Sequence, residues 1–550
     1  MNKLILILTL ISYSLFAKMI PVENFAEKSQ FDHLRISPDG KHIAYIYIDD
    51  DQSKMAIMNM ETKKGVYSLV APSNREFSNV WWLNNNRVIV LNNEITGWLD
   101  GKNRFYEIVG VDINGKNREV YPFNNVVSEL KSDPESFLIS RRYDGESVSL
   151  FKFNYTTGIK SYILDQPKAI GDGDAIIFYV AVDLNDNPRS ALEYDPQVKD
   201  DFNDDIYRLH VKNLSGEWEH LNFPSINKGE VSYSIAGMNS TNDVIYFTSD
   251  YNLVNGGTIG FFSYDLKSKE ITKLFRHEDV DVQNVIKAAN GAVIGISYDA
   301  GYRNYYYVLD PLVQKEITFH KSIRKSFTDQ NISFVNYTQD EKKAVLFVNS
   351  DKNPGDYYIF NRLNNEASYF ISTNPKIKPK EMAVVEPFVL TARDGLKMYG
   401  QMTIPPNIKL SNLPMVIFPH GGPYGVKDRW GWDDRAQLLA SRGYLVVQLD
   451  FRGSGGYGQV FKEKGYSEWG MKMQDDLTDA TLWAINQGFA DKKRVCIHGV
   501  SYGGYAAMQG IVREPDLYKC AIADAGIYDI DLQWKKADSF YGGYKKEKNQ

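Results

Sequence analysis

The stretch Arg494–Gln509 reads RVCIHGVSYGGYAAMQ and contains the pattern G-x-S-x-G centred on Ser501. Val495–Ile497 is an apolar, β-prone run, and Ala506–Gln509 has good helix propensity. A strand that turns directly into a helix leaves little space around the central residue, and glycines two positions to either side allow the close approach. The stretch therefore predicts a strand–turn–helix elbow that presents the Ser501 hydroxyl as a nucleophile; an ordinary Gly-Ser turn is the alternative.

Strands and helices alternate around this elbow. This order is typical of a parallel sheet with helices on both faces, an α/β-hydrolase type of domain over residues 380–550, in which ligands gather at the carboxyl ends of the strands. His420–Gly422 and Ser501 both follow predicted strands, so we expect them to face the same cleft. The predicted elements are an antiparallel pair at Val384–Leu390 and Leu396–Ile404, strands at Met415–Phe418, Tyr444–Leu449 and Cys520–Ala523, and helices at Asp434–Arg442 and Gln474–Gln487.

Acyl transfer through a serine needs a nucleophile, a base and hydrogen-bond donors for the oxyanion. Ser501 supplies the nucleophile. The backbone N–H of Tyr502, at the start of the predicted helix, points to where negative charge develops. We expect the second donor to be the N–H of Gly422, because a glycine lets the backbone approach the substrate; a tight turn without chemistry is the alternative.

Residues 31–372 have a different pattern, which predicts a β-propeller. Short alternating runs rich in Tyr, Val, Ile and Phe are separated by Asn, Asp and Gly turns, with no long amphipathic helix. A turn-then-strand phrase, first seen as ISPDGKHIAYI at Ile36–Ile46, recurs about every 45 to 50 residues, the length of a four-stranded blade. With an irregular unit at Ala175–Leu221, which carries an acidic insertion at Asp200–Asp205, we predict about seven blades. A polar linker, Asn374–Lys380, follows.

Four stretches of the carboxy-terminal part together resemble the prolyl oligopeptidase family of serine peptidases, and most closely its branch of acylaminoacyl peptidases and related dipeptidyl peptidases. The resemblance extends from Val384 to Ile530. It implies that a propeller gates access to the hydrolase domain, admitting short peptides and excluding folded proteins. It also implies Ser501 as nucleophile and Tyr502 and Gly422 as oxyanion donors. The stretches are HGGP (His420–Pro423), DFRGSGGYG (Asp450–Gly458), WGMKMQDD (Trp469–Asp476) and GVSYGGYAAM (Gly499–Met508).

Other family features are weaker or missing. Arg452 and the pair Asp475–Asp476 match family positions, and we interpret them as structural. The chain contains no Glu-Glu pair, the motif with which the branch resembling dipeptidyl peptidase IV holds a free amino terminus. The sequence therefore does not support that specificity.

The lack of a histidine that could act as base for Ser501 is the main departure from the family pattern. In α/β-hydrolases the triad runs Ser, then Asp or Glu, then His, yet all eight histidines here precede Ser501. We expect His498 to serve packing and His420 to belong to the oxyanion loop, so neither is a good base. The family places its Asp and His beyond the position of Gln550. We therefore expect these residues to be a carboxy-terminally truncated serine peptidase that is inactive alone; an esterase and a non-catalytic propeller binding protein are the alternatives.

Composition and charge indicate which classes of partner and cofactor to expect. The 63 basic and 69 acidic residues give a net charge of -6 without a polybasic cluster, so we expect no nucleic-acid partner. We predict no cofactor and no metal, and short peptides as substrates. The two cysteines, Cys496 and Cys520, lie on predicted neighbouring strands, where we expect two buried free thiols.

The amino terminus predicts export. Met1–Lys3 is a short basic start, Leu4–Phe16 is mostly apolar, and Ala17 offers a small residue for cleavage. The apolar run is too short to span a bilayer comfortably. We predict a signal peptide over residues 1–17 and a periplasmic or secreted protein that is free of the membrane after cleavage; an uncleaved anchor is the alternative.

Overall fold

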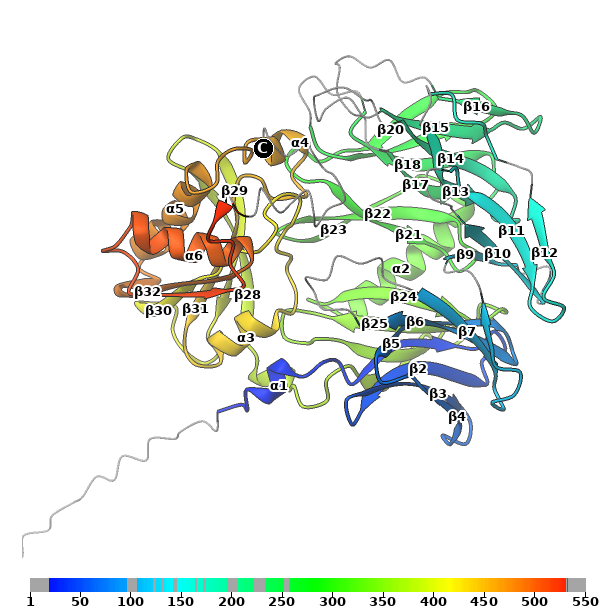
Figure 1. Ribbon diagram of the computed structural model, residues 1–550, viewed down its shortest axis with the longest axis horizontal. Coiled ribbons are helices and arrows are strands. Elements are labelled where there is room, and N and C mark those ends of the chain that lie inside the picture. The colour runs from blue at the N-terminus through cyan, green and yellow to red at the C-terminus, as the bar shows by residue number, and fades with distance from the viewer. Residues whose placement is uncertain are drawn as a thin grey trace, which may run out of the picture.

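A computed structural model of the chain describes residues 19–95, 106–121, 125–130, 133, 135–141, 146–163, 166–171, 175–195, 206–221, 233–251, 257–530 and 532. Figure 1 shows a ring of small sheets beside a single larger sheet that is flanked by helices. The predicted signal peptide and the acidic insertion Asp200–Asp205 lie outside the described residues.

The ring is a seven-bladed β-propeller, which confirms the predicted fold and blade number. Six blades have four antiparallel strands and the sixth in chain order has three. The strands, blade by blade, are β1 (Phe31–Ile36), β2 (His42–Asp49), β3 (Gln52–Asn59) and β4 (Gly65–Val70); β5 (Arg75–Asn84), β6 (Arg87–Glu94), β7 (Tyr106–Asp112) and β8 (Glu119–Tyr121); β9 (Asn125–Glu129), β10 (Ser136–Arg141), β11 (Ser149–Asn154) and β12 (Lys160–Ile163); β13 (Ile176–Val182), β14 (Pro188–Asp195), β15 (Ile206–Lys212) and β16 (Trp218–His220); β17 (Tyr233–Met238), β18 (Val244–Ser249), β19 (Gly260–Asp265) and β20 (Ile271–Phe275); β21 (Val282–Lys287), β22 (Val293–Ala300) and β23 (Tyr302–Tyr307); β24 (Asn331–Tyr337), β25 (Lys343–Asn349), β26 (Asp356–Asn361) and β27 (Glu366–Ser372).

The repeated turn-then-strand phrase forms the first hairpin of a blade. In blade 1 a carboxylate oxygen of Asp39 accepts hydrogen bonds from Ser37 Oγ (2.7 Å) and from the backbone N–H two residues later (3.0 Å). In blade 7 Asp340 accepts the equivalent bonds from Thr338 Oγ1 (2.7 Å) and from the N–H two residues later (3.1 Å). These Asp turns satisfy backbone donors locally, which explains why the same residue types recur at these two hairpins.

A helix takes the place of the fourth strand in blade 6, so our expectation of no long helix in residues 31–372 was wrong. After the short 3-10 turn η1 (Pro311–Val313), helix α2 (Gln314–Ser326) begins. Its buried residues Ile317, His320 and Ile323 recur every third position. Ile317 packs into the core of blade 6 and Ile323 into that of blade 7. The helix therefore fills the space between the two blades.

The hydrolase domain is built on one six-stranded sheet in the order β28-β29-β31-β30-β32-β33. The pair β28–β29 is antiparallel and the pairs among β31, β30, β32 and β33 are parallel, as predicted, and the pair β29–β31 is also antiparallel. After η2 (Pro379–Glu381), the elements are β28 (Val384–Thr391), β29 (Lys397–Ile404), β30 (Leu413–Ile417), α3 (Asp434–Ala440), β31 (Leu445–Asp450), α4 (Gln459–Glu463), α5 (Lys472–Asn486), β32 (Ala490–Val500), α6 (Tyr502–Arg513) and β33 (Cys520–Asp524).

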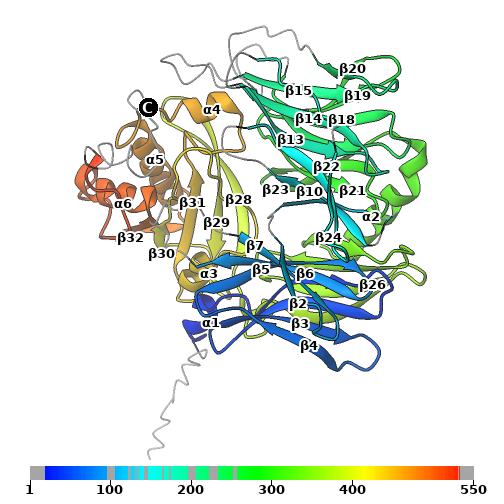
Figure 2. The same cartoon turned by 45° about the vertical axis from the view of Figure 1, so that its right-hand side comes forward.

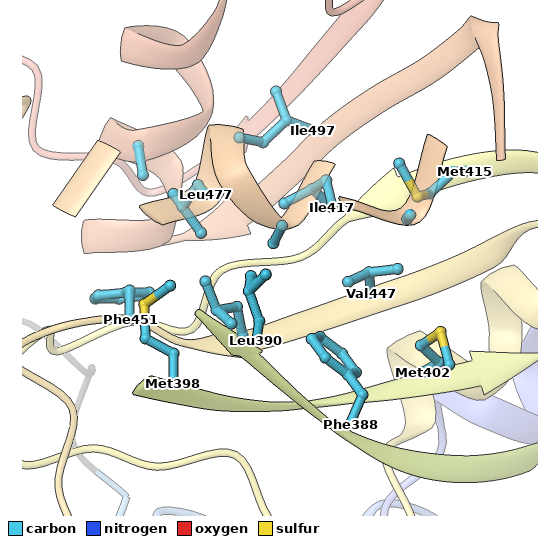
Figure 3. Packing of buried hydrophobic residues seen from close by; sticks show 14 of the residues in the cluster. Phe388, Leu390, Met398, Met402, Met415, Ile417, Val447, Phe451, Leu477 and Ile497 are labelled. Atoms are coloured by element: carbon cyan, nitrogen blue, oxygen red, sulfur yellow. The ribbon is translucent and has the colours of Figure 1, made fainter. Parts of the chain in front are cut away.

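Helices cover both faces of this sheet. On one face Ile417, Val447 and Ile497 pack against Leu477 of α5, and Figure 3 shows these side chains converging with those of β28 and β29. On the other face Phe418 and Val446 pack against Ala436 of α3. Adjacent residues of one strand thus point to opposite cores, as the period of two requires.

The two domains are joined by hydrogen bonds between propeller carboxylates and the backbone of the hydrolase domain. The carboxylate of Asp281 accepts from the N–H of Ile259 (2.6 Å) in the propeller and from that of Gly458 (3.3 Å) in the hydrolase domain. The carboxylate of Asp351 accepts from the N–H of Val385 (2.8 Å). The glycine-rich stretch Asp450–Gly458 therefore contributes to domain docking.

The amino-terminal segment docks on the hydrolase domain. Helix α1 (Glu23–Ala26) lies beside α3 in both views (Figures 1 and 2). Phe25 stacks on Trp432, with ring centroids 6.3 Å apart, and Arg442 donates to the carbonyl of Ile20 (2.7 Å). Among the described helices, none is both long and apolar enough to cross a membrane.

Cys496 and Cys520 form a disulfide, which corrects our expectation of two buried free thiols. The two residues are direct register partners on the parallel strands β32 and β33, with Cα atoms 4.7 Å apart. Cys520 is exposed and Cys496 only half-buried. The neighbouring strands were predicted, but the register that brings the two sulfurs together is a tertiary property.

Candidate active site

Ser501 lies at a strand–turn–helix elbow between β32 and α6. Its backbone angles, φ 58° and ψ -119°, fall in a region that residues with a side chain rarely adopt. The turn is held on both sides: the Ser501 N–H donates to the carbonyl of Asp524 (2.9 Å), and its own carbonyl accepts from the N–H of Tyr505 (3.1 Å). Strain of this kind persists only where the surroundings impose it and is concentrated at functional sites.

The glycines that flank the elbow are required by close backbone contacts. A Cβ atom at Gly499 would lie 2.4 Å from the backbone of Gly503, and one at Gly503 would lie 2.3 Å from the carbonyl oxygen of Pro419. Both distances are far shorter than any normal carbon contact. The elbow thus packs against its own helix and against the loop that follows β30.

The loop after β30 lies directly against Ser501. A Cβ atom at Gly421 would lie 3.4 Å from Ser501 Cβ and 4.0 Å from Ser501 Oγ. Gly422, our predicted oxyanion donor, is the next residue and has φ 119°, which favours glycine. The structure thus brings Ser501 and the predicted oxyanion loop together at the carboxyl ends of β30 and β32.

Tyr502 has separate roles for its backbone and its side chain. As the first residue of α6 its N–H has no acceptor within the helix, so it is available at the positive end of the helix dipole. Its ring is fully buried, with centroids 4.7 Å from Trp469 and 5.4 Å from Phe451. The side chain therefore fixes the helix that carries the N–H.

His420 orients the oxyanion loop instead of facing Ser501. Its Nε2 lies 2.8 Å from Ser454 Oγ and its Nδ1 lies 2.7 Å from the carbonyl oxygen of Gly421. Burial lowers the pKa of His420 to about 4, so the ring is neutral. Nδ1 then donates to Gly421, and Nε2 accepts from Ser454. Because the C=O and N–H of a trans peptide point in opposite directions, this bond turns the Gly422 N–H away from the ring.

Sequence reasoning missed Ser454 as a member of this site. Ser454 is fully buried within the stretch DFRGSGGYG, which we singled out only for its resemblance. Next to it, Asp450 accepts a hydrogen bond from the Tyr457 hydroxyl, and burial raises the pKa of Asp450 to about 6. A polar residue in an otherwise glycine-rich loop was the available signal.

His498, the other nearby histidine, also makes contacts away from Ser501. The ring of His498 stacks on Phe418, with centroids 5.0 Å apart, and its Nδ1 lies 3.1 Å from the carbonyl oxygen of Ile522. Neither His420 nor His498 is hydrogen-bonded to Ser501. The carboxylate of Asp524 lies 3.5 Å from Arg435 on the surface. Within the described residues the site therefore brings together the predicted nucleophile and the predicted oxyanion loop, but neither nearby histidine contacts Ser501 as a base would.

Arg452 and Asp476 form a buried ion pair behind the site. Asp476 accepts from Arg452 Nε (2.8 Å), Nη2 (2.7 Å) and the backbone N–H (3.0 Å). Arg452 also binds Asp394 in the β28–β29 turn (2.8 Å). The pair thus ties the end of β31 to α5. No cluster of three or more potential metal-ligating side chains occurs in the part of the chain that the structure describes.

Comparison with known proteins finds similarity to a peptidase family and to two curated peptidases. Residues 430–550 match the model of the Prolyl oligopeptidase family. Dipeptidyl aminopeptidase BIII of Pseudoxanthomonas mexicana is 25% identical over 93% of this chain and 72% of its own length. Dipeptidyl peptidase family member 6 of Caenorhabditis elegans is 22% identical over 99% of this chain and 75% of its own length.

The fold has a counterpart among solved structures. Prolyl oligopeptidase B from Galerina marginata, bound to a 25mer macrocyclization substrate, superposes with a TM-score of 0.60 and 15% identity. The match covers 96% of this chain and 78% of that one. It supports the arrangement of a propeller followed by an α/β-hydrolase domain.

Proposed function

Because this chain carries a prolyl oligopeptidase family serine peptidase domain behind a seven-bladed propeller, we propose that it hydrolyses peptide bonds of short peptides through an acyl-enzyme on Ser501. The observation that carries the proposal is the strained backbone of Ser501, φ 58° and ψ -119°, at the elbow between β32 and α6. That conformation holds the hydroxyl clear of the sheet, beside a loop that offers backbone N–H groups.

The reaction proceeds through two acyl transfers. Ser501 Oγ attacks the scissile carbonyl carbon while its proton passes to a base, and the carbonyl oxygen becomes an oxyanion. The N–H groups of Tyr502 and Gly422 donate to that oxygen, each such donor contributing about 3 to 4 kcal/mol. The C–N bond then breaks, the leaving amine takes the proton, and water hydrolyses the ester to release Ser501.

The base is a residue other than His420 and His498. The ring of His420 is hydrogen-bonded to Ser454 and Gly421, and that of His498 to the carbonyl of Ile522. In the hydrolase fold the Asp and His of the triad follow the nucleophile in the chain. We expect activity from the product of the complete reading frame that encodes these residues, and none from residues 1–550 alone, because a serine without a base is a weak nucleophile.

The propeller restricts the substrates to short peptides. Two observations support this: the ring stands next to the hydrolase domain, and rim residues such as Asp281 and Asp351 bond directly to hydrolase backbone. A folded protein is too large to enter between two domains that are held together in this way. The similarity to dipeptidyl aminopeptidases supports an exopeptidase, although the chain contains no Glu-Glu pair.

The experiment measures amide hydrolysis by the full reading-frame product and by residues 1–550, each with Ser501 and with Ser501→Ala. Dipeptidyl and N-acetyl-aminoacyl nitroanilides are compared with a nitrophenyl ester and a folded protein. We expect Ser501-dependent cleavage of amides by the longer protein only. Ester cleavage without amide cleavage would make it an esterase. An unlabelled Ser501 after treatment of the longer protein with a fluorophosphonate would make the hydrolase domain vestigial.

Export of the protein is part of the proposal. The amino-terminal sequence Met1–Ala17 has the form of a signal peptide, and the disulfide between Cys496 and Cys520 is of a kind that persists in oxidising compartments. Fractionation of cells that express the chain should place it outside the cytoplasm, lacking its first 17 or so residues. A protein retained in the cytoplasm with an intact amino terminus would refute export.

A further inference from the structure

A cavity of about 1230 Å³ lies between two propeller blades and the hydrolase domain, apart from the site at Ser501. One wall is formed by β23 and α2 of blade 6, another by loops of blade 7, and the hydrolase domain contributes Val384, Val385 and Trp430. None of the residues of the elbow or of the oxyanion loop lines it. Its volume exceeds the roughly 300 to 1,000 Å³ of small-molecule pockets, so several residues of an extended peptide fit.

Cationic side chains dominate one wall of this cavity. They come from two elements, β23 and α2, with a further lysine opposite them on blade 7. Arg324 and Lys325 lie in the last turn of α2, where the helix dipole favours cations. The dipole does not account for the cations on β23 and blade 7. The cations are Arg303, Lys321, Arg324, Lys325 and Lys352, and the acids are Asp329, Asp351 and Asp356.

Two of these cations lie over aromatic rings, and Arg324 also makes side-chain hydrogen bonds with Tyr305 and Tyr307. The guanidinium carbon of Arg324 lies 3.5 Å from the ring centroid of Tyr305, and Lys321 Nζ lies 4.8 Å from that of Tyr307. A guanidinium has five N–H donors, so Arg324 keeps donors for a carboxylate beyond its bonds to the two tyrosines. Lys325 lies in the last turn of α2 and lines the same cavity.

The acids on the opposite side do not neutralise this wall. Asp351 is buried and accepts from the N–H of Val385 (2.8 Å), while Asp356 accepts from Asn353 Nδ2 (2.8 Å). Both carboxylates are thus bound to neutral donors within blade 7 and at the domain boundary. Arg303 is paired with Asp299 (3.3 Å), and Asp329 follows α2. The excess of positive charge on this wall therefore comes from Lys321, Arg324 and Lys325.

We propose that this cavity is a second binding site, which takes an acidic peptide with its carboxylates on the wall formed by Arg324, Lys321 and Lys325. Tyr302 and Trp430, whose ring centroids lie 5.6 Å apart, cover the hydrolase end of the cavity and offer apolar contact. Because its lining comes from both domains, a bound peptide bridges the propeller and the hydrolase domain. The proposal does not depend on chemistry at Ser501.

The test uses Ser501→Ala protein, so that no peptide is cleaved, and a dye-labelled octaglutamate peptide whose binding is followed by fluorescence anisotropy. The matched variants are Arg324→Gln, inside the cavity, and Lys315→Gln, on the same helix but outside it. A lost charge-assisted pair contributes about 1.5 to 3 kcal/mol, which corresponds to at least tenfold weaker binding for Arg324→Gln. We expect Lys315→Gln to leave the affinity unchanged.

A variant outside the helix, a neutral peptide and a salt titration test the proposal if a helix variant folds poorly. Lys352→Gln, on blade 7, should also weaken octaglutamate binding, and octaglutamine should not bind. Binding should fall as salt is raised, because the contacts are ionic. Equal losses in Lys315→Gln and Arg324→Gln would show unspecific attraction and overturn the proposal, as would octaglutamine binding as tightly as octaglutamate.

Discussion

Replacing Asp476 by alanine should destabilise the hydrolase domain more than any surface substitution. Asp476 is fully buried and accepts three hydrogen bonds from Arg452, at 2.7, 2.8 and 3.0 Å. Without it, the guanidinium keeps only Asp394, whose side chain is 41% exposed. The variant therefore leaves the buried Arg452 charge with one carboxylate partner in place of two.

The magnitude follows from the burial of the pair. Removing one partner of a buried ion pair costs about 3 to 5 kcal/mol, a large share of the roughly 5 to 15 kcal/mol that stabilises a domain. The matched control is Asp491→Ala, because Asp491 pairs with Arg494, whose side chain is 52% exposed. That exposed pair contributes about 0 to 1 kcal/mol. Replacing Arg452 and Asp476 together by leucine should recover most of the loss, because no charge is then left buried.

Hydrogen exchange measured by mass spectrometry at increasing urea is the appropriate assay, because it reports on β31 and α5 separately from the propeller. The two domains need not unfold together, so a single midpoint would mix their stabilities. We expect the opening free energy of peptides from α5 to fall by about 3 kcal/mol or more in Asp476→Ala. A loss no larger than that of Asp491→Ala would refute the argument that burial decides the effect.

Three further predictions concern the elbow, the disulfide and the oxyanion loop. Gly503→Ala places a Cβ atom 2.3 Å from a backbone carbonyl oxygen and should cost about 1 to 3 kcal/mol of stability in the hydrolase domain, measured by the same hydrogen-exchange experiment on peptides from α6. Gly65→Ala, in β4 with open space around it, should leave the stability of the propeller unchanged. The double variant Cys496→Ser with Cys520→Ser, which opens a loop with a sequence separation of 24, should lose about 3 kcal/mol and become insensitive to reductant; equal sensitivity before and after would contradict it. The pKa of His420, lowered to about 4 by burial, lies below the unfolded value of 6.5, so the unfolded chain takes up the proton first as the pH falls. Stability should therefore decline between pH 6.5 and 4, and His420→Gln should flatten that decline in unfolding curves measured across this range.

Local patterns in the sequence predicted most of the fold. The turns of the propeller use Asp or Asn, since their side chains accept hydrogen bonds from backbone N–H groups two residues later. The elbow at Ser501 was predicted for the same reason: the strand, the glycines and the helix are contiguous. Helix α2 was missed, because its apolar residues every third position are few and lie among strands with similar composition.

The parts of the candidate site that come from distant segments were predicted less completely. That the oxyanion loop meets Ser501 followed from the rule that the carboxyl ends of parallel strands share an edge. The bond between Ser454 and His420 did not follow from any rule, because the two residues are 34 positions apart and nothing in either segment specifies the other.

The sequence by itself determined the kinds of element, their order, the repeat of the propeller and the position of the elbow at Ser501, because each is encoded by residues next to one another. Only the tertiary structure decided that Cys496 pairs with Cys520, that His420 is neutral and turned toward Ser454, and that a cationic cavity opens between blade 6, blade 7 and the hydrolase domain. These properties depend on register, burial and the contact between domains, which arise when segments far apart in the chain pack together.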